Sequence, residues 1–179
     1  MSSSEFYQAE KFAEPLLSAD LAYDYEQTPA QFFAQAPAER LGTNCKVVGH
    51  QFTREVLGVE LPTDLQIAEA YFDSDSPNAP LRRVHPTENL RMGDWILYGR
   101  QSRMHPRLVA PRFDAEGNML NWRELAINHQ GVYLGSHRGN SMILHATPAN
   151  GVAISAQNDI LRDRRTEIIY EVLRTRSTS

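Results

Sequence analysis

The chain has 179 residues and a formal net charge of −4. This length suits one domain with a short extension, which can bury a core without disulfides or structural metals. The acidic balance argues against nucleic acid as the main partner, and no apolar run is long enough to span a membrane. The first residues lack the basic segment and apolar run of a secretion signal, so we expect a cytoplasmic protein; non-classical delivery to the envelope or to another cell is the alternative.

Helical patterns come first along the chain. Residues 1–39 are predicted to form a helical extension packed on the core, with a mobile arm as the alternative. Residues 40–174 are predicted to form the main domain, and residues 175–179 a tail. Apolar residues at helical spacing predict four helices, over residues 5–17, 29–35, 45–57 and 62–72.

Strand patterns begin at residue 95. Apolar and β-branched runs predict strands over residues 95–98, 125–134, 141–146, 152–155 and 166–173. Turns at residues 138–140 and 149–151 connect three of these strands. Residues 99–124 are basic and contain prolines, and we expect this insertion to form a long hairpin or a lid. Helices followed by antiparallel strands predict an α+β fold.

The single cysteine, Cys45, lies in the first turn of the third predicted helix, where Thr43 or Asn44 can cap it. A helix N-terminus and a nearby imidazolium both favour the thiolate, which is the nucleophilic form of cysteine. One cysteine also excludes an intrachain disulfide. Taken alone, a cysteine on an apolar helix stripe is more often a small buried hydrophobic residue.

Two histidines, His129 and His145, lie in successive predicted strands. If these strands pair through the turn at 138–140, both side chains can lie on one sheet face, diagonal to each other. His129 is then the candidate base, and His145 the group that orients it. Each histidine alone is more often a hydrogen-bonded sheet residue. The order of cysteine, histidine and histidine favours a catalytic triad.

The tetrahedral intermediate of such a reaction needs hydrogen-bond donors for its oxyanion. The backbone amide of Cys45 is the first candidate, because it lies at a helix N-terminus. Asn44 and Tyr133 are candidates for the second donor. The six histidines and one cysteine show no closely spaced ligand pair, and no phosphate-binding loop or Gly-x-Ser-x-Gly motif occurs. No metal ion and no other cofactor is therefore predicted.

Four motifs resemble those of the NlpC-type papain-like cysteine peptidases, a family of cell-wall amidases and endopeptidases. The Asn-Cys pair at 44–45 resembles the start of the family's nucleophile helix, and Gly-Asp-Trp-Ile-Leu-Tyr at 93–98 its Gly-Asp strand. His-Gln-Gly-Val-Tyr-Leu-Gly at 129–135 is similar to its His-Val-Gly-Ile-Tyr-Leu-Gly strand. Met-Ile-Leu-His-Ala at 142–146 resembles its hydrophobic His-Ala strand.

The resemblance implies a papain-like fold, with the nucleophile helix packed on an antiparallel sheet. It implies a cysteine hydrolase that cleaves an amide in peptidoglycan stem peptides or related γ-D-glutamyl peptides, with Cys45, His129 and His145 as the triad. It also makes Asp94 a candidate substrate-binding residue. The chain departs from the family at residues 46–47, which are Lys-Val instead of Ser-Gly. An acyltransferase or thioesterase on this scaffold, and a catalytically inactive binding domain, are the alternatives.

Overall fold

The structure is a computed structural model that describes residues 10–11, 13–18, 21–100, 110, 112–116, 120 and 126–176. Most of the predicted insertion at 99–124 lies outside the described residues, as does the tail from residue 177. The described chain combines helices with an antiparallel sheet, so the predicted α+β class is confirmed. No helix in the described part is long and apolar enough to cross a membrane.

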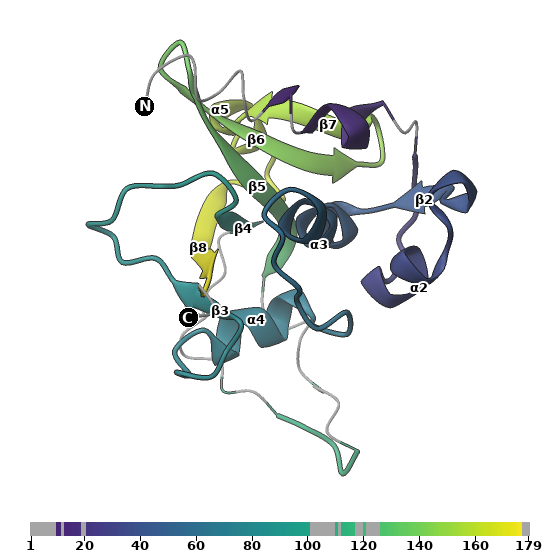
Figure 1. Cartoon of the computed structure of the whole chain (residues 1–179). Helices are drawn as coiled ribbons and strands as arrows, with labels where there is room; N and C mark the ends of the chain where they lie inside the picture. The colour runs from purple at the N-terminus through teal and green to yellow at the C-terminus, as the bar shows by residue number, and fades with distance from the viewer. Residues whose placement is uncertain are drawn as a thin grey trace.

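The main sheet has six antiparallel strands in the order β3-β8-β4-β5-β6-β7 (Figure 1). Its strands are β3 (Leu81–Arg83), β4 (Trp95–Gly99), β5 (Ile127–His137), β6 (Asn140–Thr147), β7 (Gly151–Ala156) and β8 (Ile168–Thr175). A separate two-stranded parallel sheet joins β1 (Ala22–Tyr23) to β2 (Gly42–Thr43). The predicted strands are thus confirmed, with ends that differ by up to three residues, whereas β1, β2 and β3 were not expected.

The helices are α2 (Pro29–Ala34), the 3₁₀ helix η1 (Pro37–Glu39), α3 (Cys45–Glu55), α4 (Ile67–Asp73) and α5 (Gln157–Ile160). Residues 13–17 are also helical. Helix α4 begins later than the predicted residue 62, because Gln66 and Glu69 form a capping box at its N-terminus. The predicted extension packs on the core, since Ala13 and Leu16 belong to the main apolar cluster.

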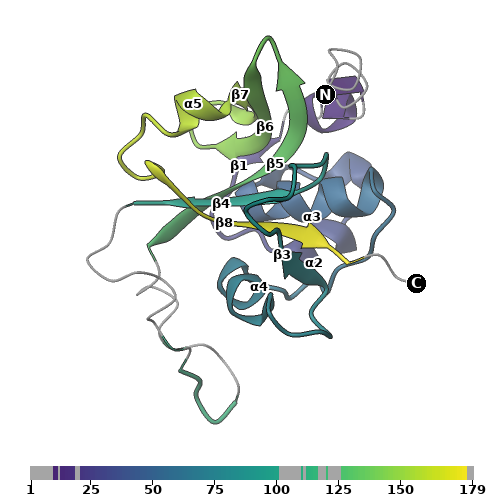
Figure 2. The same ribbon diagram turned by 90° about the vertical axis from the view of Figure 1, so that its left-hand side faces the viewer.

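The two faces of the sheet carry different apolar clusters. On one face, Val48 and Phe52 of α3 pack with Trp95 and other sheet residues. On the other face, Ile96 packs with Ile160 of α5. Consecutive residues of β4 therefore face opposite layers, as strand geometry requires. Figure 2 shows α3 and α5 on different sides of β5.

Strand β5 contains a one-residue bulge that decides which way its side chains face. The hairpin turn of Arg138 and Gly139 has positive φ angles of 49° and 80°, which suits a two-residue turn. Next to the turn His137 pairs with Asn140, but beyond the bulge Val132 pairs with Leu144. The register has shifted by one residue between these two pairs.

The bulge places the two candidate histidines on one face. The register next to the turn would put His145 opposite Val132, on the face that α3 covers. The shifted register puts His145 opposite Gly131 instead, on the face of His129. The shared face that the sequence predicted therefore depends on the bulge as well as on the turn.

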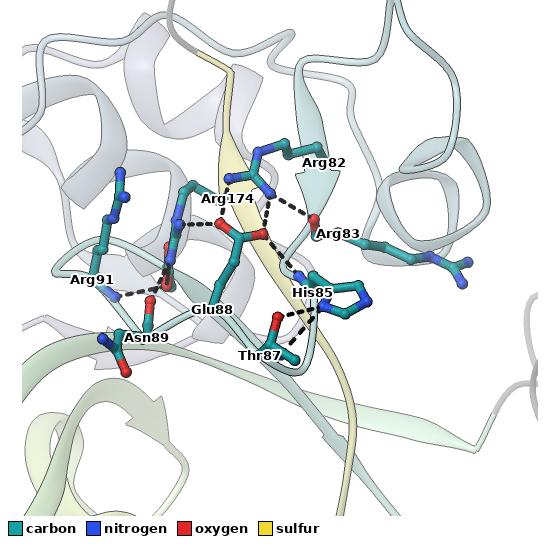
Figure 3. A network of polar contacts seen from close by, with 9 residues as sticks. Arg82, Arg83, His85, Thr87, Glu88, Asn89, Arg91 and Arg174 are labelled. Atoms are coloured by element: carbon teal, nitrogen blue, oxygen red, sulfur yellow. Dashed lines mark hydrogen bonds and ion pairs between the residues drawn. The ribbon is translucent and has the colours of Figure 1, made fainter.

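A partly buried polar network fixes the connection between β3 and β4 against β8 (Figure 3). Glu88 accepts hydrogen bonds from Arg82 at 2.8 Å and from Arg174 at 2.9 Å. Arg174 also donates to both carboxylate oxygens of Asp94, at 2.7 Å each. Bidentate geometry makes this a strong pair. It ties the start of β4 to the end of β8.

Candidate active site

Helix α3 begins at Cys45, with Asn44 as its N-cap. The Asn44 Oδ1 accepts the Val47 backbone N–H at 3.0 Å, which satisfies one of the free amides of the first turn. The Nδ2 of Asn44 donates to the carbonyls of Asp24 at 2.9 Å and Gln27 at 2.7 Å. Both amide hydrogens are thus used within the protein. We therefore assign Asn44 to positioning of the helix start and not to the oxyanion.

Three donors surround the Cys45 sulfur. The backbone N–H groups of Gln130 and Lys46 and the hydroxyl of Tyr23 lie close to the sulfur and favour its thiolate form. The structure thus brings the thiol to the residue that directly follows His129 in β5. Tyr23 reaches it because β1 pairs with β2, in the register Tyr23 with Thr43. Sequence reasoning missed Tyr23, since a two-residue strand carries no periodicity that predicts its partner.

The resting thiol of Cys45 is protonated at neutral pH. Burial raises the pKa of Cys45, and this effect exceeds the opposing hydrogen bonds from Gln130, Lys46 and Tyr23 and the nearby Lys46 charge. The Nζ of Lys46 contacts the Gln66 Oε1 at 3.2 Å, which links α3 to the start of α4. Lys46 thus adds a positive charge near the sulfur.

The two histidines form a hydrogen-bonded pair. The His129 Nε2 lies 2.8 Å from the His145 Nδ1, and the His145 Nε2 lies 2.9 Å from the Ser155 Oγ. Only 9% of His129 and 6% of His145 are exposed. Burial, followed by the positive charges of His145 and Arg165, lowers the pKa of His129 to about 3. Burial also lowers the pKa of His145 to about 4. Both rings are neutral at pH 7.

A cavity of about 380 Å³ opens at the histidine pair. Its walls come from the chain around β1, the end of β4, the β6–β7 turn and the segment after β7. Residues that line it include Tyr23, Tyr25, Arg100, His129, His145, Ser155, Asp159, Asp163 and Arg165. Asn128, beside His129, donates to the Arg165 carbonyl at 2.9 Å and fixes the segment after α5. The cavity therefore has a polar, charged wall next to the candidate base.

Of the six predicted site residues, only His129 and His145 line this cavity. Asp94 is 1% exposed, and both its carboxylate oxygens are bound by Arg174. The Tyr133 hydroxyl lies 3.3 Å from the Ser136 Oγ, and its ring packs in the apolar cluster of Ile96. We therefore assign Asp94 and Tyr133 to the fold, and not to substrate or oxyanion binding.

No metal centre is evident in the part of the chain that the structure describes, because its histidine, cysteine and acidic side chains form no group of three or more that could hold an ion. The cavity instead brings together two histidines and the hydroxyl groups of Tyr23 and Ser155, and the Cys45 thiol lies near the Tyr23 hydroxyl. These are groups that can act in nucleophilic and general acid–base catalysis. Comparison with protein-family models and with curated proteins found no match for the chain.

Proposed function

We propose that the protein is a papain-like cysteine hydrolase that cleaves an amide bond through Cys45, His129 and His145. The hydrogen-bonded series from His129 through His145 to Ser155, with the Cys45 sulfur at the neighbouring Gln130 amide, is the observation that supports this proposal. Nucleophilic catalysis requires a thiol beside an oriented base, and the backbone of Gln130, which follows His129 in β5, lies near the Cys45 sulfur. The sequence resemblance to NlpC-type peptidases supports the same reaction.

The reaction begins from a neutral thiol and a neutral imidazole. As the substrate enters, His129 takes the thiol proton, and the Cys45 sulfur attacks the amide carbon. The oxyanion accepts hydrogen bonds from the Cys45 backbone amide and from the Tyr23 hydroxyl, which already contacts the sulfur. His129 then gives its proton to the leaving amine. Water, deprotonated by His129, hydrolyses the remaining thioester and restores the thiol.

The substrate class follows from the resemblance and fits the cavity. We propose peptidoglycan stem peptides or related γ-D-glutamyl peptides, which are polar and carry several charges. The cavity wall offers matching groups in Arg100, Arg165 and Asp159. If an amine instead of water attacks the thioester, the same residues perform acyl transfer.

A second candidate function is a catalytically inactive domain that binds a peptide or protein partner. The raised pKa of Cys45 and the lowered pKa of His129 favour this candidate, because they leave no thiolate–imidazolium pair in the resting site. An inactive domain needs no charge on either group.

The test is product analysis by mass spectrometry after incubation with a panel of muropeptides, with and without added amine acceptors. Hydrolysis is expected for the wild type, and a loss of about a thousandfold or more for Cys45→Ala and for His129→Ala. Products joined to the added amine would assign the transferase reaction. Absence of any turnover, together with an iodoacetamide labelling rate of Cys45 that His129→Ala leaves unchanged, would assign the binding domain.

A further inference from the structure

The hydrogen bonds of the two histidines limit where their protons can lie. Both rings are neutral, so each carries one proton on Nδ1 or Nε2. The contact between His129 Nε2 and His145 Nδ1 needs one proton, and so does the contact between His145 Nε2 and Ser155 Oγ. Only two arrangements satisfy both contacts.

In the first arrangement both rings carry their proton on Nε2. His129 then donates to His145, His145 donates to the Ser155 oxygen, and the His129 Nδ1 keeps a free lone pair. In the second arrangement both rings carry their proton on Nδ1, and Ser155 donates to His145. The Nδ1 of His129 is then occupied and cannot accept the thiol proton. Only the first arrangement leaves the base competent.

We propose that Ser155 is a positioning residue, which accepts the His145 Nε2–H and so holds His129 in the tautomer that can deprotonate Cys45. This inference rests on the proposed function, because the competent tautomer matters only if His129 acts as the base. It adds a fourth member to the predicted triad. Ser155 acts through His145 and does not touch the reacting atoms.

The register of β6 and β7 explains why Ser155 reaches this place. His145 pairs with Ala153, whose small side chain leaves room above the ring. Ser155 lies two residues further on the same face, diagonal to His145, within the range of cross-strand contacts.

The surroundings of Ser155 favour its role as an acceptor. Among the described residues, His145 is the only hydrogen-bond partner of the Ser155 hydroxyl. Ser155 lines the cavity together with both histidines, but it is only half-buried, whereas the histidines are buried. Its own proton can therefore point to water or substrate in the cavity, which leaves its lone pairs free for the His145 Nε2–H.

The experiment is long-range ¹⁵N–¹H NMR of ¹⁵N-histidine-labelled protein at pH 7, which reports the tautomer of each ring without any substrate. The wild type is expected to show His129 and His145 protonated on Nε2. Ser155→Ala removes the acceptor and is expected to populate the Nδ1–H forms of both rings. Ser155→Thr keeps the hydroxyl, and Ser155→Asp offers an acceptor alone; both are expected to retain the wild-type tautomers.

Kinetics on the muropeptide substrate gives the second measurement. Ser155→Ala is expected to lower kcat by about 10- to 100-fold with little change in KM, as loss of an orienting partner does, and Ser155→Thr is expected to restore it. The matched control is Ser141→Ala, which removes a hydroxyl from the neighbouring strand β6, four residues before His145. It is expected to change neither the tautomers nor kcat.

Nδ1–H histidines in the wild type, or unchanged tautomers in Ser155→Ala, would overturn the role of Ser155. If Ser155→Ala does not fold, Ser155→Asp and Ser155→Thr still test the proposal. Histidine rings protonated on Nδ1 in either variant would also overturn the role of Ser155. Failure of the wild type to hydrolyse any substrate would overturn the proposed function alone, since the NMR spectra would still report the tautomers.

Discussion

At the scale of single residues, Tyr23 is the side chain that changes the description of the site most. Its hydroxyl contacts the Cys45 sulfur, and its ring lies at the cavity. It comes from a segment that the sequence assigned to a helical extension. The surroundings of the candidate nucleophile thus include a part of the chain that lies before the predicted catalytic domain.

Tyr23→Phe is expected to raise the pKa of Cys45 further, because the lost hydroxyl donates a hydrogen bond that favours the thiolate. The rate of iodoacetamide labelling against pH measures this shift. Tyr25→Phe is the matched control, since Tyr25 is 72% exposed and packs on the Tyr23 ring. If the labelling rate of Tyr23→Phe depends on pH as that of the wild type does, Tyr23 does not influence the Cys45 thiol.

Gln130 is a second informative residue, because its side-chain amide is fully buried and neither Nε2 nor Oε1 has a partner. The amide packs against α3 where Gly49 has no side chain; a Cβ there would lie 1.9 Å from the Gln130 Nε2. An unsatisfied buried amide costs about 1–3 kcal/mol. Only the backbone N–H of Gln130 is used at the thiol.

Gln130→Met is therefore expected to raise the free energy of unfolding by about 1 kcal/mol or more, because an apolar chain of similar shape replaces the unpaired amide. Urea unfolding monitored by circular dichroism measures the change. The same substitution at Gln51 is the control: its Nε2 donates to Glu55 at 2.9 Å, so less is gained there. A less stable Gln130→Met protein would show that the amide has a partner in solution.

At the scale of elements, the pair of Asp94 and Arg174 joins β4 to β8. Asp94 was a candidate for substrate binding, but its carboxylate has no free oxygen directed at the cavity. The pair instead holds β4 in place. Because β4 hydrogen-bonds to β5, it thereby stabilises the strand that carries His129. The pair of Asp94 and Arg174 therefore contributes to the stability of the fold.

Asp94→Asn is expected to lower the free energy of unfolding by about 3 kcal/mol, because it leaves the buried Arg174 with half of its counter-charge. Thermal and urea unfolding measure the loss. Asp159→Asn is the matched control: its ion pair with Arg162 is exposed, and such pairs contribute about 1 kcal/mol or less. Equal losses in the two variants would contradict the assignment of Asp94 to the fold.

Local sequence patterns were sufficient to predict most of the helices and strands. Asn44 and the apolar stripe after it predict α3, because a cap and a 3.6-residue period act within one segment. The strands β5 and β6 follow from their apolar runs and the Arg138–Gly139 turn. The contact between His129 and His145 follows from their places on these strands only together with the bulge in β5.

Longer-range features could not be predicted in this way. The bulge in β5 lies between Tyr133 and Gly135 and depends on how two strands pack together. The residues of β5 before Gly135 show no pattern that predicts it. Tyr23 reaches Cys45 through strands of two residues each. Asn44 was expected at the oxyanion because of its position beside the cysteine, yet its amide is taken up by Asp24 and Gln27.

At the scale of the whole molecule, three buried histidines couple folding to pH. Burial lowers the pKa of His50 and of His145 to about 4 and that of His129 to about 3. In the unfolded chain histidines bind protons below about pH 6.5. Between these values the unfolded state binds more protons than the native state, so the free energy of unfolding falls as pH falls.

The loss is expected to begin near pH 6.5 and to approach about 1.4 kcal/mol per pH unit for each histidine. Urea unfolding at a series of pH values from 7.5 to 4.5 measures it. His50→Phe, which keeps a ring beside Trp95, is expected to give a shallower fall. A flat profile in the wild type would show that the histidines are protonated in the folded protein.

Strand β7 lies at one end of the six-stranded sheet. This position makes the site, which includes Ser155 of β7, less stable than the fold as a whole. An end strand is held by hydrogen bonds along one side, so it opens locally at a lower free energy than the strands inside the sheet. Each opening of β7 carries Ser155 away from His145 while Cys45 and His129 stay in place. On warming, the β7 amides are expected to exchange with deuterium before those of β5. The turnover of the proposed reaction is expected to decline over the same temperature range as the exchange of the β7 amides begins.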